Sequence, residues 1–211
     1  MKKKRVVFLD RDGTLNRDVG YPGHWSQIHI YPYAFDAVRR IREAGLAAVV
    51  ITNQSGIGRG FFSEDDLAAL HARFAAAFEK HRARLDGFFH CPHFSSSVPA
   101  VTESDCSCRK PNPALGLRAA AELGLDLRGS YMVGDKAADV LFGLNVGAVP
   151  VLVLTGYGKP ASRELEAAGI RPAHVAENLA AAADWICGRE HRASSGPGHP
   201  RGRGGSGHAP V

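Results

Sequence analysis

Short apolar runs alternate with segments of helical periodicity along most of this chain, and this alternation constrains the fold more than any other feature. The apolar runs predict strands at residues 6–9, 46–52, 87–90, 130–134, 150–155 and 173–176. The segments between and after them predict helices at 34–45, 63–85, 112–124, 136–147, 160–169 and 178–189. Such alternation is typical of βαβ units. We therefore expect an α/β fold, a Rossmann-like three-layer αβα sandwich with a mainly parallel sheet.

Length and composition indicate a single globular domain. Of the 211 residues, 45% are hydrophobic and 22% charged, and no apolar run approaches the ~20 residues of a membrane span. We expect one domain over residues 1–190 and no membrane partner. Residues 191–211 are rich in Gly, Ser, Pro and Arg, so they are predicted to form a disordered tail. The basic N-terminus precedes only four apolar residues, too few for a signal peptide, which predicts a cytoplasmic protein.

The net charge of +5 comes from the two ends of the chain. Residues 2–5 are all basic, and the tail adds three arginines without an acid. The 19 basic residues between them face all 21 acidic ones, so the domain itself is slightly acidic. Basic ends can contact phosphate backbones without specificity, but we do not expect nucleic acid to be the partner.

Polar side chains follow the first four predicted strands. They are Asp10 and Asp12, then Thr52 with residues 53–56, then Arg109 and Lys110, and finally Asp135 with Lys136 and Asp139. In a parallel sheet, ligands bind beyond the carboxyl ends of the strands, where the strand order reverses. The sequence therefore predicts that these groups meet in one cleft.

Two neighbouring carboxylates at the end of a buried strand require a positive partner, because burying a charge is costly unless it is paired or bound to a metal. Mg²⁺ prefers carboxylate and carbonyl oxygens and usually also binds a substrate phosphate. One carboxylate can attack phosphorus to give an aspartyl phosphate, while another protonates the leaving oxygen and then activates water. The polar residues thus favour Mg²⁺-assisted phosphoryl transfer.

The stretches FLDRDGTLN, VVITNQSG, CRKPNP and YMVGDKAAD resemble, in this order, the four motifs of the haloacid dehalogenase superfamily of phosphatases. This resemblance implies that Asp10 is the nucleophile and Asp12 the general acid/base. It also implies that Asp10, the main-chain carbonyl of Asp12 and Asp135 bind Mg²⁺. Thr52 and Lys110 would stabilise the transferring phosphoryl group.

Other motif residues leave alternatives open. Asp139 either contacts the residues that bind magnesium without binding the metal itself, or is an exposed helix acid. Asn53 either binds the phosphoryl group or satisfies the turn. Lys136 either contacts substrate or is a solvated lysine at a helix start. Gln54 and Ser55, which follow Asn53, are predicted to contact substrate as well.

Three of the four cysteines lie with a histidine in residues 91–108, spaced as Cys91-x-His93, twelve residues, then Cys106-x-Cys108. Paired ligands on two short turns are typical of a structural zinc site with tetrahedral Cys₃His coordination. The alternatives are free thiols or a disulfide, and a disulfide is disfavoured without an export signal. Cys187 is expected to be a core thiol.

The zinc loop directly before CRKPNP resembles that of the D-glycero-D-manno-heptose 1,7-bisphosphate 7-phosphatases, which share it with the histidinol-phosphate phosphatases. NRDVGY and NQSGIGRGFFSE also resemble the heptose enzymes. The resemblance implies Mg²⁺-dependent hydrolysis of the 7-phosphate of a heptose bisphosphate through an aspartyl phosphate. The product would be a heptose 1-phosphate, used for the nucleotide-activated heptose of lipopolysaccharide or surface polysaccharide.

The gaps at 15–32 and 91–108 are too short for a cap domain, so we expect a capless enzyme with an open site. Zinc would fix the loop that places Arg109, whose guanidinium suits the distal phosphate of the substrate, unless it is simply a surface arginine. A capless single domain is compatible with a monomer. The residues expected on the sugar side, where a plain turn is the alternative, are Asp18, Gly20 and Tyr21.

Three other functions remain open at the level of sequence. A histidinol-phosphate phosphatase would act on a substrate with one phosphate and a cation, which an arginine at the distal site disfavours. A nucleic-acid-end phosphatase would use the basic termini. A non-enzymatic phosphoaspartate switch domain would not need Asp12 as an acid/base. The sequence does not indicate which anomer of the heptose is the substrate.

Overall fold

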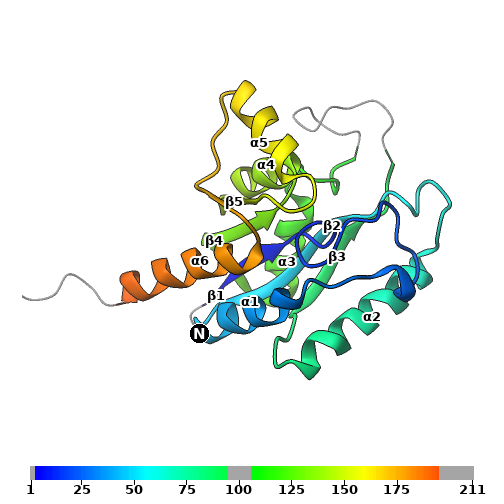
Figure 1. Ribbon diagram of the computed structural model, residues 1–211, viewed down its shortest axis with the longest axis horizontal. Helices are drawn as coiled ribbons and strands as arrows, with labels where there is room; N and C mark the ends of the chain where they lie inside the picture. The colour runs from blue at the N-terminus through cyan, green and yellow to red at the C-terminus, as the bar shows by residue number, and fades with distance from the viewer. Residues whose placement is uncertain (1–2, 95–105, 195–211) are drawn as a thin grey trace, which may run out of the picture.

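The computed structural model describes residues 3–94 and 106–194, and its centre is a six-stranded sheet (Figure 1). The strands are β1 (Lys4–Leu9), β2 (Ala47–Asn53), β3 (Gly87–Cys91), β4 (Leu125–Gly134), β5 (Val149–Val153) and β6 (His174–Ala176). They lie in the order β3-β2-β1-β4-β5-β6, and each neighbouring pair is parallel. The predicted α/β architecture with a parallel sheet is confirmed.

Helices cover both faces of this sheet. They are α1 (Pro32–Glu43), α2 (Glu64–Lys80), α3 (Ala114–Leu123), α4 (Ala137–Asn145), α5 (Gly158–Ala167) and α6 (Leu179–Ser194). Helices α1, α2 and α6 pack on one face, and α3, α4 and α5 pack on the other. Between β1 and α1 the chain forms only loops and the short 3₁₀ helix η1 (Trp25–Gln27).

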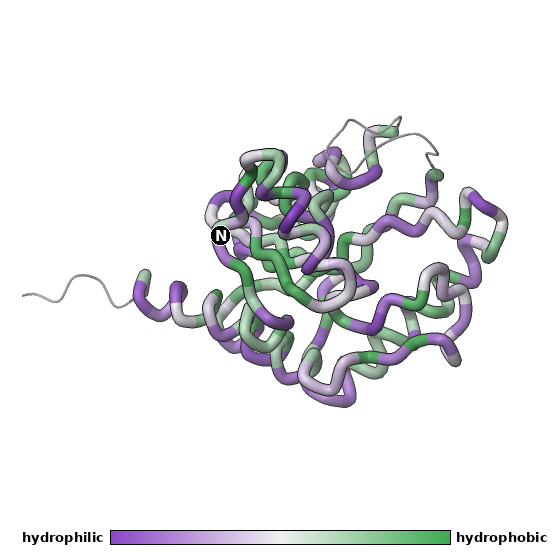
Figure 2. Tube along the Cα trace, turned by 45° about the horizontal axis from the view of Figure 1, so that its top comes forward, coloured by the Kyte–Doolittle hydropathy of each residue, from purple (hydrophilic) through white to green (hydrophobic). Residues whose placement is uncertain are grey.

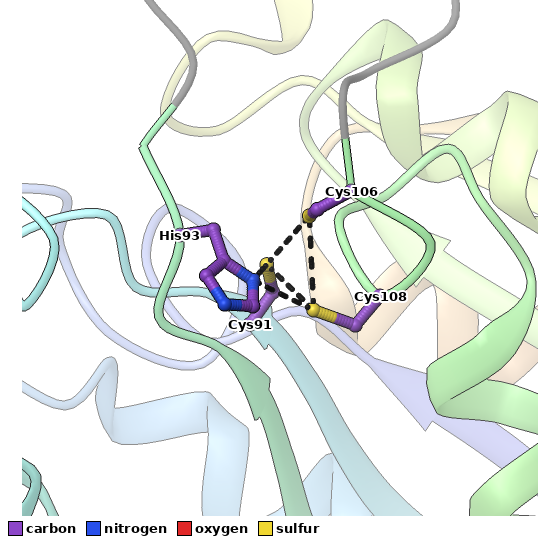
Figure 3. A group of neighbouring side chains, drawn as sticks. All are labelled: Cys91, His93, Cys106 and Cys108. Atoms are coloured by element: carbon purple, nitrogen blue, oxygen red, sulfur yellow. Dashed lines mark hydrogen bonds between the residues drawn. The ribbon is translucent and has the colours of Figure 1, made fainter.

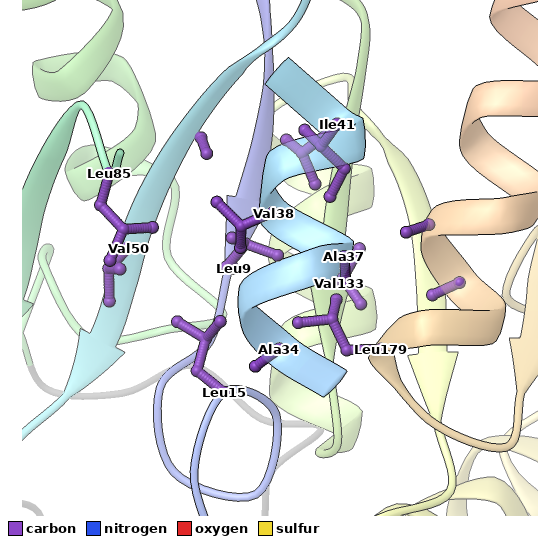
Figure 4. Close-up of a cluster of buried hydrophobic side chains, with 14 of the residues drawn as sticks. Leu9, Leu15, Ala34, Ala37, Val38, Ile41, Val50, Leu85, Val133 and Leu179 are labelled. Atoms are coloured by element: carbon purple, nitrogen blue, oxygen red, sulfur yellow. The ribbon is translucent and has the colours of Figure 1, made fainter. Parts of the chain in front are cut away.

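Strand β1 shows why the sheet is buried on both faces. Val7 and Leu9 point into the cluster beneath α1 and α6, while Val6 and Phe8 point into the cluster beneath α3 and α4. Helix α1 meets the first cluster with a stripe of apolar side chains spaced three and four residues apart (Figure 4), namely Ala34, Ala37, Val38 and Ile41. Burying the larger of these side chains, Val38 and Ile41, contributes about 1.5–3 kcal/mol each relative to exposure. Figure 2 shows the hydrophobic residues concentrated on the central strands.

Local signals set the helix ends that frame the site. Ser63 caps α2, since its side chain accepts the Asp66 N–H at 3.1 Å and the Asp66 carboxylate accepts the Ser63 N–H at 2.9 Å. The helix ends at Lys80, five residues before the predicted end, because the chain turns at Arg82 with φ of 55°. That turn returns the following residues to the core of the first face.

Two other boundaries differ from the prediction. Strand β4 begins at Leu125 rather than residue 130, because its first half pairs with β1 across a shift in register. Helix α6 continues to Ser194, so residues 191–194 extend the helix past the expected start of the tail. The rest of that segment, 195–211, lies outside the described residues, as do residues 95–105 of the predicted zinc loop. Across the described ranges, every helix is too short or too polar to cross a membrane.

Candidate active site and metal centre

The polar residues singled out above lie at the carboxyl edge of the sheet. Asp10 and Asp135 directly follow the neighbouring strands β1 and β4, and Thr52 stands near the end of β2. The strand order reverses between β1 and β4, because β1 leads outward to β2 on one side and β4 to β5 on the other. This is the position at which open α/β sheets bind their ligands.

Lys110 contacts residues of β2, of α4 and of the loop after β1. Its ammonium group lies 2.7 Å from Asp10 Oδ1 and 2.6 Å from Asp139 Oδ1, and it donates to the main-chain oxygen of Ile51 at 2.8 Å. Burial alone would lower the pKa of Lys110, but the two carboxylates outweigh it and raise that pKa, so the lysine stays charged. Burial raises the pKa of Asp10, with Lys110 opposing this shift. A further cation would favour the ionised form that a nucleophile requires.

Asp135 provides the observation that points to a metal. Its Oδ2 accepts the Tyr157 N–H at 2.7 Å, while its Oδ1 is buried without a hydrogen-bond partner. Burial raises its pKa to about 8. Gly13 and Gly156, both with positive φ, leave room for this carboxylate, because a Cβ at either position would come within 2.1 Å of Oδ2.

Carboxylate oxygens of Asp10, Asp135 and Asp139 all lie within 4.8 Å of one another. A cluster of buried carboxylates with one orphaned oxygen fits a hard divalent cation such as Mg²⁺. Asp139 is already engaged, because its Oδ2 accepts the Lys136 N–H at 2.9 Å and its Oδ1 pairs with Lys110. Asp139 is also almost fully buried, so the alternative of an exposed helix acid is wrong.

Asp12 faces a different set of partners. Its carboxylate accepts hydrogen bonds from the guanidinium of Arg11 (2.8–3.2 Å), from Asn16 Nδ2 (2.9 Å) and from Gln54 Nε2 (3.0 Å). Burial alone would raise the pKa of Asp12, but Arg11 and these hydrogen bonds outweigh it and lower that pKa. Gln54 Nε2 also donates to Thr52 Oγ1 at 2.8 Å. The structure therefore places Gln54 as a link between Asp12 and Thr52.

Two further predicted site residues are occupied by contacts within the protein. Asn53 binds the backbone of Lys110 on both sides, accepting its N–H at 3.0 Å and donating to its carbonyl at 3.1 Å. Lys136 Nζ lies 3.1 Å from Asp18 Oδ2, and Asp18 Oδ1 accepts the Gly20 N–H at 2.8 Å. These contacts connect the loop after β1 with the start of α4.

The remaining predicted contacts lie on exposed loops. The Tyr21 ring is 43% exposed and lies 5.3 Å from the guanidinium of Arg59, which also covers the Phe94 ring at 3.4 Å. Arg109 donates to the His93 carbonyl at 3.2 Å. The Ser55 carbonyl accepts the Arg59 N–H at 3.1 Å, so Ser55 lies in a tight turn of the same rim. No motif in the sequence indicates that Arg59 lies between the rings of Tyr21 and Phe94.

The Cys/His cluster gathers side chains from the end of β3 and from the segment that leads to Lys110 (Figure 3). Cys91 ends β3, and its sulfur is 3.4 Å from that of Cys106 and 3.0 Å from that of Cys108. His93 Nδ1 lies 3.3 Å from the Cys108 sulfur. These four atoms form one of the groups that could hold a metal ion. Tetrahedral zinc with Zn–S bonds of about 2.3 Å separates its sulfurs by about 3.8 Å, close to this spacing.

His71, on α2, is buried against the site and makes stability depend on pH. Burial, with Arg11 adding to it, lowers its pKa to about 3, against 6.5 in the unfolded chain. Between these values the unfolded chain binds a proton that the folded chain does not. The free energy of unfolding should therefore fall as the pH drops from 6.5 toward 3, by up to about 1.4 kcal/mol per pH unit from this group.

The His71→Gln variant should consequently lose less stability than the unmodified protein between pH 6.0 and pH 5.0. Its slope of unfolding free energy against pH should be smaller by the amount that corresponds to the uptake of about one proton. Urea unfolding at several pH values, with magnesium and zinc present throughout, measures this difference. Identical slopes in the two proteins would show that His71 is protonated in the folded state.

Comparison with known proteins gives a consistent result. Residues 107–182 match the HAD-hydrolase-like family model. The chain is 42% identical over 165 residues to the D-glycero-beta-D-manno-heptose-1,7-bisphosphate 7-phosphatase of Yersinia pestis, covering 77% of this chain and 86% of that one. It is 40% identical over 189 residues to the D-glycero-D-manno-heptose-1,7-bisphosphate 7-phosphatase of Thermosynechococcus vestitus (strain NIES-2133 / IAM M-273 / BP-1), covering 86% and 95%.

The fold is also similar to a solved structure. The D,D-heptose 1,7-bisphosphate phosphatase from B. bronchiseptica, complexed with magnesium and phosphate, superimposes with a TM-score of 0.76 at 31% identity. The match covers 88% of this chain and 99% of that chain.

Proposed function

Because this chain belongs to the D-glycero-D-manno-heptose-1,7-bisphosphate 7-phosphatase family of HAD-like hydrolases, we propose that it hydrolyses the 7-phosphate of D-glycero-D-manno-heptose 1,7-bisphosphate. The products are heptose 1-phosphate and inorganic phosphate, in the biosynthesis of nucleotide-activated heptose. The observation that carries this proposal is the buried group of Asp10, Lys110 and Asp139 beside the orphaned oxygen of Asp135. It provides a nucleophile, a fixed cation and a metal site in one place.

The proposed metal is Mg²⁺, held by Asp10, Asp135 and the main-chain carbonyl of Asp12. When bound, Mg²⁺ would neutralise phosphate charge and favour the ionised form of the nucleophile. The clustered carboxylates support this assignment. Both oxygens of Asp139 already have partners, Lys110 and the Lys136 N–H. We therefore propose that Asp139 positions Lys110 and does not bind the metal.

In the first step, a carboxylate oxygen of Asp10 bonds to phosphorus while the bond from phosphorus to the sugar oxygen breaks. Asp12 is ionised in the free enzyme, so it takes up a proton as the negatively charged substrate binds. It gives that proton to the leaving oxygen, and the sugar leaves as an alcohol. In the second step, water attacks phosphorus while Asp12 takes a proton from that water. The bond between phosphorus and the Asp10 oxygen breaks, which restores the Asp10 carboxylate and releases inorganic phosphate. Lys110 and Thr52 stabilise the charge on the phosphoryl oxygens in both steps.

We propose that zinc in the Cys/His cluster has a structural role. Cys108 stands two residues before Lys110, so fixing the cluster fixes the start of the segment that carries both Arg109 and Lys110. Arg109, on the exposed side of this segment, is suited to contact the 1-phosphate of the substrate. Four cysteines without a disulfide support a reducing compartment, and we propose a cytoplasmic enzyme that acts as a monomer.

The test is phosphate release, with Mg²⁺, from both anomers of the heptose 1,7-bisphosphate and from histidinol phosphate. We expect a bisphosphate to be preferred by at least about tenfold in kcat/KM. Phosphorus NMR of the product should show that the 1-phosphate is retained. Arg109→Ala should reduce that preference, while Arg118→Ala, at an exposed position of α3, should not. Equal or better turnover of histidinol phosphate would refute the heptose assignment. A stable phosphoenzyme without turnover would indicate a switch domain.

A further inference from the structure

Arg11 is fully buried beside the proposed acid/base, and the mechanism above does not use it. Its Nε and Nη2 donate to the two oxygens of Asp12, and Nη2 also donates to Gln54 Oε1 at 3.0 Å. Its Nη1 lies 3.2 Å from His71 Nε2. A buried guanidinium is costly unless its donors are satisfied, and here its three nitrogen atoms all have partners.

His71 holds the far end of this guanidinium. It is 8% exposed, and its ring stacks on Phe88 with centroids 4.6 Å apart and planes at 24°. The low pKa described above keeps the ring neutral, so Nε2 accepts a hydrogen bond from Arg11 Nη1. Because the ring is packed between α2 and β3, it fixes where the guanidinium can lie.

We propose that Arg11 is a positioning residue, which with His71 behind it holds the Asp12 carboxyl group in the orientation for giving a proton to the leaving oxygen and for taking one from the attacking water. The inference rests on the proposed function, in which Asp12 is the acid/base. Both Asp12 oxygens accept hydrogen bonds from the guanidinium, Oδ1 from Nε and Oδ2 from Nε and Nη2, and a lysine ammonium, which is a single point of charge, cannot reproduce this set of contacts. Gln54 then connects Asp12 to Thr52, whose hydroxyl faces the phosphoryl group in the proposed mechanism.

A positioning role has a kinetic signature that a merely structural role lacks. An alkyl leaving group needs a proton as it departs, whereas p-nitrophenolate leaves without one. Misplacing Asp12 should therefore slow the first step with alkyl phosphates and spare it with p-nitrophenyl phosphate. The second step, in which Asp12 activates water, should slow for both substrates because they form the same aspartyl phosphate.

The first experiment compares Arg11→Lys with the unmodified enzyme in rapid-mixing assays with Mg²⁺ and zinc present. With glycerol 2-phosphate or the heptose bisphosphate, the first-step rate should fall about 10²-fold, the lower end of what general acid catalysis supplies. With p-nitrophenyl phosphate, a burst of one p-nitrophenol per enzyme should remain within about threefold of the unmodified rate, followed by slow turnover. Arg118→Lys, at an exposed position of α3, is the control.

A matched pair at His71 tests the outer contact even if Arg11→Lys does not fold. His71→Gln keeps an acceptor where Nε2 stood, and His71→Leu removes it. We expect His71→Leu to show the same selective loss with alkyl phosphates, and His71→Gln to recover most of it. Thermal unfolding of both variants at pH 7 checks that they fold.

Equal first-step losses with alkyl and aryl phosphates, or identical rates for the two His71 variants, would overturn the inference. Failure of the proposed function gives a different result. The enzyme would then leave heptose bisphosphate untouched, while the contrast between glycerol 2-phosphate and p-nitrophenyl phosphate would still report on Arg11.

Discussion

Replacing Asp10 with asparagine should abolish phosphatase activity, lowering kcat by at least about 10⁴-fold, because the amide cannot form the covalent intermediate. The protein should still fold. Asp10 lies in a cluster of three carboxylates, and burial already disfavours its charge. A neutral amide of the same shape removes a like-charge repulsion, and Lys110 keeps its contacts with Asp139 and Ile51.

The matched control is Asp65→Asn, which removes an exposed carboxylate in the first turn of α2, away from the site. Phosphate release measures turnover, and mass spectrometry of acid-quenched enzyme measures the aspartyl phosphate. We expect the covalent species in the unmodified enzyme and the control, and none in Asp10→Asn. An activity above about one thousandth in that variant would place the nucleophile elsewhere.

The sequence predicts the positions of the strand-end residues well because their order depends on topology alone. Asp10 and Lys110 are 100 residues apart, yet a parallel sheet brings the carboxyl ends of β1, β2 and β4 to one edge. The polar side chains that follow those strands therefore meet whatever the details of packing. The same argument places the Cys/His cluster beside Lys110, since β3 ends at Cys91.

The Arg11–His71 contact lies beyond such reasoning. Its formation depends on how α2 is rotated about its axis and on which side chain of α2 comes opposite the loop after β1. Helical spacing indicates that residues 67–78 include a buried face, but spacing alone does not reveal what that face contacts. The available signal was an arginine between two aspartates at the end of a buried strand, where a charge has to be paired.

The boundaries of β4 and α6 were also set by tertiary contacts. The first half of β4 contains Asp126 and Gly129, and Asp and Gly are poor strand formers; this half is extended because it pairs with β1. The last turns of α6 continue past residue 190, where Glu190 contacts Arg5 and accepts the Tyr131 hydroxyl at 2.7 Å. Neither effect is visible in local propensity.

Loss of a zinc ligand should be the other large effect, and the fourth cysteine provides its control. Cys108→Ser should lower zinc content from about one per chain to near zero and reduce the free energy of unfolding by roughly 4 kcal/mol, as loss of a structural metal does. Cys187→Ser, on α6 and apart from the cluster, should change neither quantity appreciably. Metal analysis and urea unfolding measure both.

The same substitution should lower kcat by about 10²-fold with Mg²⁺ saturating, because a misplacement of about 1 Å at Lys110 is enough for such a loss. The chemical groups all remain, so the defect reports on position alone. Lys110 is two residues from Cys108, and its backbone is held from the other side by Asn53. Asn53→Ala should therefore lower kcat by a larger factor in the Cys108→Ser protein than in the zinc-loaded enzyme. A double-mutant cycle on kcat measures this difference. Full activity in zinc-free Cys108→Ser would mean that the Asn53 contacts and the burial of Lys110 suffice to place the lysine without the metal.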